Sequence, residues 1–139
     1  MSNDLARQIV ASPRSLAVVG LSTDPARDSF TVSRYLQRNG FDIVGVNPAH
    51  SEALDAACYP SLDDLPVDTR DRIDTVLVFR RPETVPRILA DCARLGLSRV
   101  WLQPGVSSPR AVELAHSLEL ELVHDQCIRV VHSVHQHHG

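Results

Sequence analysis

The sequence of 139 residues lacks long hydrophobic runs, and no apolar stretch approaches the ~20 residues that a membrane-spanning helix needs. Residues 1–7 lack the basic and apolar regions of a signal peptide. Cysteine is scarce: the three residues are widely separated, and an odd number does not suit a disulfide framework. We therefore expect a cytoplasmic protein with reduced thiols and no membrane segment.

An excess of positive charge is also missing. The net charge is −3 at pH 7, so a general nucleic-acid-binding surface is not supported. With 43% hydrophobic residues, the chain is long enough for one domain with a core and too short for two. We expect residues 1–139 to form a single domain, with residues 1–12 as a leading helix or arm and residues 133–139 as a flexible His-rich tail.

Short apolar segments that alternate with helical patterns are present throughout. The expected strands are residues 16–19, 41–46, 73–79, 99–102 and 120–123. This alternation predicts an α/β fold, namely a Rossmann-like doubly wound sheet of about five parallel strands with helices on both faces. The stretch 49–72 is expected to be irregular, with one weak helical turn at 61–65. Ligands bind such sheets at a switch point, here expected between the first and fourth strands.

The first strand leads into a loop and a helix that together suit an anion. Gly20 ends the strand, residues 21–28 form a polar loop, and Asp28 or Ser29 is placed to cap the helix, which Gly40 should end in the left-handed conformation. The start of a helix offers N–H groups and the positive end of its dipole.

Loops that follow parallel strands lie at one edge of the sheet, so residues 21–28, 47–48, 80–82 and 103–106 should converge. These loops carry Arg27, Arg80 and Arg81, the hydroxyls of Ser22 and Ser29, and few acids. Guanidinium groups match phosphate oxygens in charge and geometry, which favours a phosphorylated ligand. The alternative is that the two adjacent arginines are a solvated surface pair.

Two nucleotide motifs are absent. Gly20 is followed by residues 21–25 without the second glycine of the dinucleotide fingerprint, and Val46-Asn47-Pro48 stands where an acid would bind the ribose. There is also no Walker lysine motif. These absences argue against an NAD-dependent dehydrogenase and an NTP hydrolase, but not against a nucleotide held by side chains and helix N–H groups.

Six segments occur in an order that resembles the small stand-alone CoA-binding proteins, whose domain is similar to the CoA-binding domain of the succinyl-CoA synthetase α chain. The segments are Gly20-Leu-Ser-x-x-Pro-x-Arg-x-Ser29, Val46-Asn-Pro48, Tyr59-Pro-Ser-Leu62, Val78-Phe-Arg-Arg-Pro-Glu83, Trp101-Leu-Gln-x-Gly-Val106 and Asp125-x-Cys-Ile-x-Val130. The resemblance covers roughly residues 13–132. Two positions depart from the family pattern: Pro104, where an apolar residue such as Leu is common, and Gln126, where Arg is common.

The resemblance implies non-catalytic binding of CoA or an acyl-CoA. The segment Gly20–Ser29 would take the pyrophosphate, and Asn47-Pro48 beside Arg27 would border the adenosine and its 3′-phosphate. Phe79 with the two arginines that follow it would line the path of the pantetheine or a phosphate, and 103–106 would lie nearer the thiol end. The implied ligand-binding residues are Gly20, Leu21, Ser22, Arg27, Ser29, Asn47, Pro48, Phe79, Arg80, Arg81, Gln103, Gly105 and Val106.

A catalytic alternative uses Cys127, which lies just past the fifth strand and close to His124. A thiolate beside a histidine would be a nucleophile on a CoA thioester or nucleotide. The other interpretations are a buried structural cysteine or a mixed disulfide with the CoA thiol. No paired carboxylates suggest acid–base catalysis, and the sequence lacks the ATP-grasp partner and phosphohistidine segment of the synthetases. We therefore expect no ligase activity from this chain alone and assign no catalytic residue.

Four histidines, at 132, 135, 137 and 138, have a spacing that can capture zinc or nickel. A flexible His-rich end usually binds metals adventitiously, so we predict no physiological metal site. The sequence leaves open a homodimer or an unidentified protein partner.

Overall fold

The computed structural model describes residues 2–138 and contains one seven-stranded sheet in the order β3-β4-β2-β1-β5-β6-β7. The neighbouring strands are parallel except for the pair β3 and β4. The strands are β1 (Ser15–Val19), β2 (Asp42–Val46), β3 (Glu52–Ala53), β4 (Ala56–Tyr59), β5 (Thr75–Val78), β6 (Arg99–Leu102) and β7 (Glu121–His124). The helices are α1 (Ser2–Val10), α2 (Asp28–Arg38), α3 (Val67–Arg72), α4 (Val85–Arg94), α5 (Pro109–Ser117) and α6 (Ile128–His138). Two short 3₁₀ helices are η1 (Leu62–Asp64) and η2 (Pro82–Thr84).

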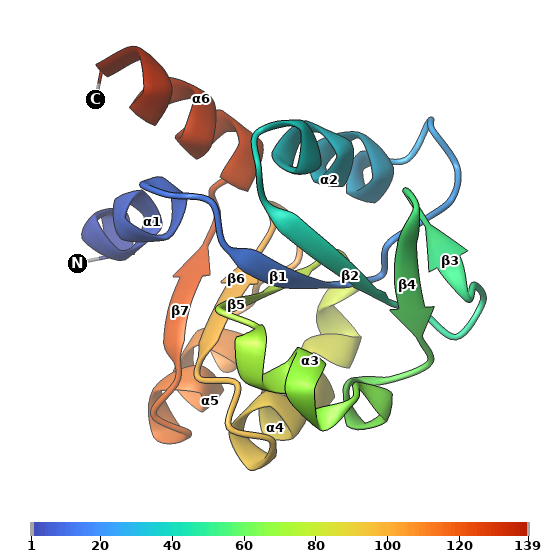
Figure 1. The fold of residues 1–139 in the computed structure, drawn as a ribbon. Helices are drawn as coiled ribbons and strands as arrows, with labels where there is room; N and C mark the ends of the chain where they lie inside the picture. Colours follow the sequence, from blue (N-terminus) through green and yellow to red (C-terminus); the bar gives the residue numbers. More distant parts are fainter. Residues whose placement is uncertain (1, 139) are drawn as a thin grey trace.

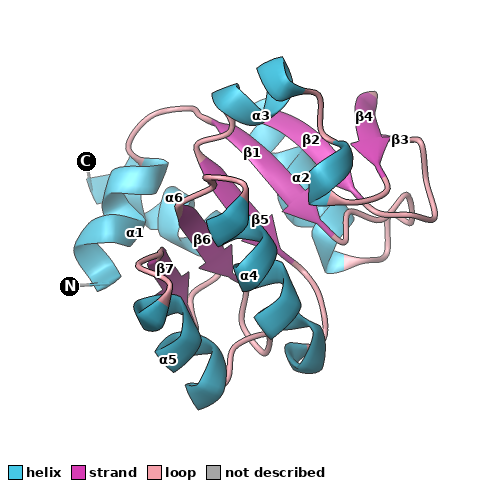
Figure 2. Ribbon diagram, turned by 90° about the horizontal axis from the view of Figure 1, so that it is seen from below, coloured by secondary structure: helices cyan, strands magenta, loops and turns pink. Residues whose placement is uncertain are grey.

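Helices cover both faces of the sheet. Figure 1 shows α1, α2 and α6 on one side of the sheet, and α3, α4 and α5 on the other. Figure 2, seen from the second side, shows α4 crossing in front of the sheet between α3 and α5. Each face therefore has its own hydrophobic cluster. Along β1, Leu16 and Val18 belong to the first cluster, while Ala17 and Val19 belong to the second, which explains why this strand is apolar without alternation.

The predicted Rossmann-like sheet is confirmed, with corrections. The hairpin of β3 and β4 lies in the stretch expected to be irregular, and α3 was not predicted there. In the sheet, β2 and then β4 lie on one side of β1, and β5 lies next to β1 on the other side. The switch point thus lies between β1 and β5, the third expected strand, and not between the first strand and 99–102 as predicted.

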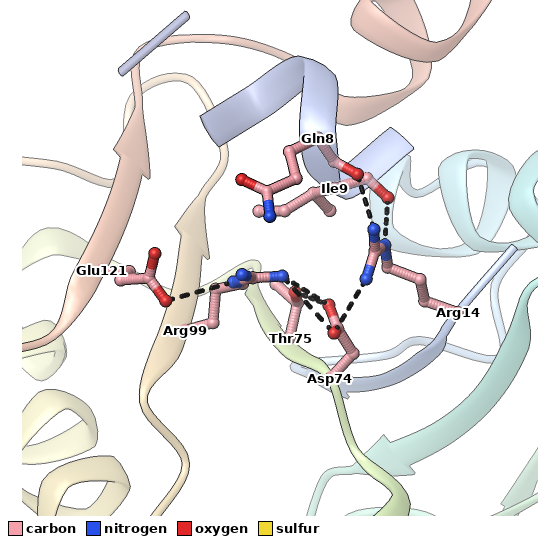
Figure 3. Close-up of polar contacts among 7 residues, drawn as sticks. All are labelled: Gln8, Ile9, Arg14, Asp74, Thr75, Arg99 and Glu121. Carbon is pink, nitrogen blue, oxygen red and sulfur yellow. Dashed lines mark hydrogen bonds and ion pairs between the residues drawn. The ribbon is translucent and has the colours of Figure 1, made fainter. Parts of the chain in front are cut away.

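Arginine side chains join the elements at the amino edge of the sheet, as Figure 3 shows. Arg14 donates to the carbonyl oxygens of Gln8 and Ile9 at the end of α1, at 2.6 and 2.7 Å. Its third contact is an ion pair of 3.0 Å with Asp74, which also pairs with Arg99 at 3.4 Å. Positive side chains stabilise the carbonyl end of a helix, so this network holds α1 against the sheet.

The carboxyl-terminal residues form a helix up to His138, where the sequence predicts a flexible His-rich tail over 133–139. Helix α6 extends to His138 and packs against α1 and α2. His132 is only 3% exposed, and its Nδ1 lies 2.7 Å from the hydroxyl of Tyr35 on α2. The rings of Tyr35 and Phe41 meet it edge-on. The apolar contacts of α6 outweigh the polar composition that suggested a loose end.

The described residues form neither a membrane-spanning helix nor a cluster of metal ligands. Within residues 2–138, no helix is long and apolar enough to cross a membrane. No three His, Cys, Asp or Glu side chains of the described residues gather closely enough to hold a metal ion. His132, one of the four histidines with metal-ligand spacing, is instead buried in the core and contacts Tyr35.

The burial of His132 predicts a pH dependence of stability. Burial lowers the pKa of His132 below its ordinary value of 6.5, and the neighbouring His135 lowers it further. As the pH falls below 6.5, the unfolded chain takes up this proton before the folded chain does, so the free energy of unfolding falls until the lowered pKa is reached. Urea unfolding between about pH 7.5 and about pH 5 measures this slope.

The variant His132→Gln should lose the part of the slope that lies just below pH 6.5. His116→Gln, an exposed position on α5, is the control and should keep it. Identical slopes in the wild type and His132→Gln would contradict the prediction.

Candidate functional site

Four parallel strands end in register at the carboxyl edge of the sheet. Val19 pairs with Val46 on one side and Val78 on the other, and Val78 pairs with Leu102. Hydrogen bonds continue one residue further, from the Gly20 N–H to Val46 at 2.8 Å and from the Phe79 N–H to Val19 at 2.9 Å. The residues that directly follow the four strand ends are Gly20, Asn47, Phe79 and Gln103. The predicted convergence of these loops follows from this register.

A cavity of about 750 Å³ opens at this edge. Ten of the thirteen predicted site residues line it, namely Gly20, Ser22, Arg27, Ser29, Asn47, Phe79, Arg80, Arg81, Gly105 and Val106. Ala26, Asp28 and Pro82, which lie inside the predicted loops, complete its wall. We call this hollow the first cavity.

The first cavity is rich in unpaired positive charge. Among the described residues, no side-chain hydrogen bond or ion pair engages the guanidinium of Arg27, Arg80 or Arg81. The single acid in its wall is Asp28, in the first turn of α2, where the helix dipole favours a carboxylate. The arginines of the amino edge are paired with acids, whereas these three are available to an anion.

The loop before α2 is held by its own polar groups. The Ser22 hydroxyl accepts from the Asp24 N–H at 2.9 Å, and the Asp24 carboxylate accepts from the Ala26 N–H at 2.9 Å. Asn47 donates to the carbonyl of Leu21 at 3.0 Å, which ties the loop after β2 to the loop after β1. Hydrogen bonds within the protein therefore define the shape of this loop.

The helix cap differs from the prediction. The N-cap residue of α2 is Arg27, and no side chain caps the helix. Ser29, expected as a possible cap, accepts instead from the Ser22 N–H at 3.0 Å and is buried under the loop. The first turn of α2 is thus left without a side-chain acceptor at the wall of the first cavity, as an anion site requires. Gly40 ends this helix region with φ +90°, as predicted.

Gly20 permits the closest approach of two of these loops. Its φ is +92°, and a Cβ there would meet the backbone carbonyl of Phe79. Because a backbone carbonyl cannot move aside as a flexible side chain can, β1 and β5 can converge only with glycine at this position.

Gly20→Ala should therefore cost more than Gly96→Ala. Gly96 also has a positive φ, +77°, but a Cβ there meets nothing within 4 Å. We expect Gly96→Ala to lose about 1 kcal/mol of unfolding free energy from backbone strain and Gly20→Ala about 2 kcal/mol more from the steric conflict. Urea unfolding followed by the fluorescence of Trp101 measures both, and equal losses would contradict the assignment.

A second cavity of about 540 Å³ adjoins the first and shares Asp28, Phe79 and Val106 with it. The rest of its wall comes from α2, from the loops after β6 and β7, and from α6. These residues are Thr31, Val32, Gln103, Pro104, Cys127, Arg129, Val130, Ser133 and Val134. The contribution of α6 was missed, although the same rule of converging strand ends applies to the segment after β7.

Gln103 organises the wall of the second cavity. Its side chain is buried, and its Oε1 accepts from the N–H of Ile128, the first residue of α6, at 2.9 Å. Its Nε2 lies 3.4 Å from the sulfur of Cys127. One amide from the loop after β6 therefore caps α6 and positions the thiol.

Removal of this cap should be measurable. Gln103→Leu leaves the buried N–H of Ile128 without its acceptor, at an expected cost of about 1–3 kcal/mol of unfolding free energy. Gln103→Glu keeps an acceptor at the same position and should lose less. Gln126→Leu is the control, since the structure shows only the backbone carbonyl of Gln126 in a hydrogen bond, from Trp101. A Gln103→Leu protein as stable as wild type would contradict the capping role.

Two predicted site residues line neither cavity. The side chain of Leu21 is fully buried in the first hydrophobic cluster, so only its backbone faces the site, through the carbonyl that Asn47 contacts. Pro48 is exposed beyond the edge of the first cavity. Leu21 and Pro48 are adjacent in sequence to Ser22 and Asn47, which do line the first cavity.

The three cysteines are free and differ in environment. Cys58 and Cys92 are buried. Burial raises the pKa of Cys92 to about 12 and also raises the pKa of Cys58. Cys127 is partly exposed in the second cavity. His124, the proposed partner in a catalytic reading, contacts the carboxylate of Asp125 at 2.6 Å and lines neither cavity.

The doubly wound sheet with a cavity at its switch point defines the class, a Rossmann-like α/β domain. Residues 14–133 match the family described as CoA binding domain, and the chain belongs to this family. The resemblance seen in the sequence motifs is thereby confirmed.

Individual relatives agree with this assignment. The uncharacterized protein YneT of Bacillus subtilis strain 168 is 33% identical over 128 residues, which cover 92% of each chain. The ADP-forming acetate–CoA ligase II of Archaeoglobus fulgidus is 34% identical over 87 residues, which cover 61% of this chain and 12% of the ligase. A solved structure of a hypothetical protein from Pyrococcus horikoshii OT3 has a TM-score of 0.87 and 29% identity, covering 98% of this chain and 93% of that one.

Proposed function

We propose that the protein binds CoA or an acyl-CoA at the carboxyl edge of its sheet and does so without catalysis. The observation that carries the proposal is the set of unpaired Arg27, Arg80 and Arg81 around the start of α2 in the first cavity. CoA carries several phosphate charges at one end and a long neutral arm at the other. The first cavity offers charge for the phosphates, and the second offers a more apolar path for the arm.

The family gives independent support. Its description is a CoA binding domain, and the matched relatives include acetate–CoA ligases of which this chain covers a small part. A binding module, such as a carrier, a sensor or a subunit of a larger assembly, fits a domain of this family. Its three free cysteines suit the reducing cytoplasm.

Isothermal titration with CoA tests the proposal. Each charge-assisted hydrogen bond contributes about 1.5–3 kcal/mol, so Arg27→Gln and Arg80→Gln should each weaken CoA binding by about tenfold or more. Arg38→Gln is the matched control, because Arg38 is an exposed arginine at the opposite end of α2. It should bind CoA as the wild type does.

Dephospho-CoA, which lacks the 3′-phosphate, should bind more weakly than CoA if an arginine contacts that phosphate. Absence of CoA binding to the wild type, or equal loss in Arg38→Gln and Arg80→Gln, would overturn the proposal. Hydrolysis of an acyl-CoA by the wild type that Cys127→Ser abolishes would replace it with the catalytic alternative.

A further inference from the structure

The second cavity has an apolar wall that the phosphates of a ligand do not explain. Val130 and Val134, one turn apart on α6, are 58% and 52% exposed and line this cavity. Among the described residues, only Val67 joins them as an exposed large hydrophobic side chain. Exposed apolar side chains that gather at a cavity mark a site of contact with another molecule.

The two cavities can be filled by one ligand. They share Asp28, Phe79 and Val106 in their walls. Arg27, Arg80 and Arg81 line the first cavity and not the second, so the phosphates of a ligand belong in the first cavity. The neutral arm of that ligand then extends into the second cavity.

The polar groups of the second cavity differ in their partners. The two ends of the Gln103 amide contact the Ile128 N–H and the sulfur of Cys127. The guanidinium of Arg129 lies 5.5 Å from the centre of the Tyr35 ring. Valine side chains offer no hydrogen bond, so an aliphatic group placed against Val130 and Val134 gains from burial.

We propose that the second cavity selects acyl-CoA ligands with a longer apolar acyl group over acetyl-CoA. The inference rests on the proposed function and adds the class of acyl group. The acyl chain lies against the α6 valines, and the phosphates stay with the arginines.

Titration of the wild type with CoA, acetyl-CoA and butyryl-CoA tests the inference. Butyryl-CoA carries two more methylene groups than acetyl-CoA, and their burial predicts binding about tenfold tighter. In the double variant Val130→Ser/Val134→Ser, acetyl-CoA and butyryl-CoA should bind with equal affinity.

Val67→Ser is the matched control. Val67 is 60% exposed on α3 and lines neither cavity, so this variant should keep the preference for butyryl-CoA. Both sets of substitutions replace exposed helical valines, so a general effect on helix stability would appear in both.

The outcomes separate this inference from the proposed function. If CoA binds but acetyl-CoA and butyryl-CoA bind equally, the inference fails and the proposed function stands; if none of the three ligands binds, the proposed function fails. A preference for butyryl-CoA that survives in the double variant overturns the inference. Sedimentation gives a further test. If the wild type and Val67→Ser are dimers and the double variant is a monomer, the two α6 valines lie in an interface and the inference is also overturned.

Discussion

The site depends on the register of the central parallel strands. Because Val19 pairs with both Val46 and Val78, the chain leaves β1, β2 and β5 at the same level. The backbone hydrogen bonds of Gly20 and Phe79 extend this alignment by one residue. The loops start from fixed points at a single edge, and α2 and α4 depart to opposite faces of the sheet there (Figure 1). A hollow between them is a consequence of the topology.

The two edges of the sheet use arginine in opposite ways. At the amino edge, Arg14 and Arg99 share the carboxylate of Asp74 and hold α1 in place (Figure 3). At the carboxyl edge, Arg27 and Arg80 line a cavity and have no acidic partner among the described residues. The charge pairs of the amino edge link elements of the fold, whereas the unpaired arginines of the carboxyl edge are the groups that the proposed function assigns to the phosphates.

Local signals in the sequence were enough to predict the five main strands and most of the first cavity, because apolar runs and turn residues place the strand ends. They missed β4, since Ala56–Tyr59 has a weak strand pattern and is recruited by pairing with β2. Side-chain direction was also beyond reach: Leu21 turns into the core within a loop that otherwise faces the site. The positions of His132 and Arg129 could not be predicted from local sequence. Only the packing of α6 against α2 shows that His132 is buried and that Arg129 lines the second cavity.

Under the proposed function, these features form one surface for a ligand with a charged end and a neutral arm. Amide chemical shifts recorded through a titration with CoA test that surface most directly. The account predicts the largest changes at the amides of Gly20, Ser29 and Arg80, with the amides of Asp74 and Thr75 at the amino edge unchanged. Changes concentrated at the amino edge, or none at the carboxyl edge, would contradict it.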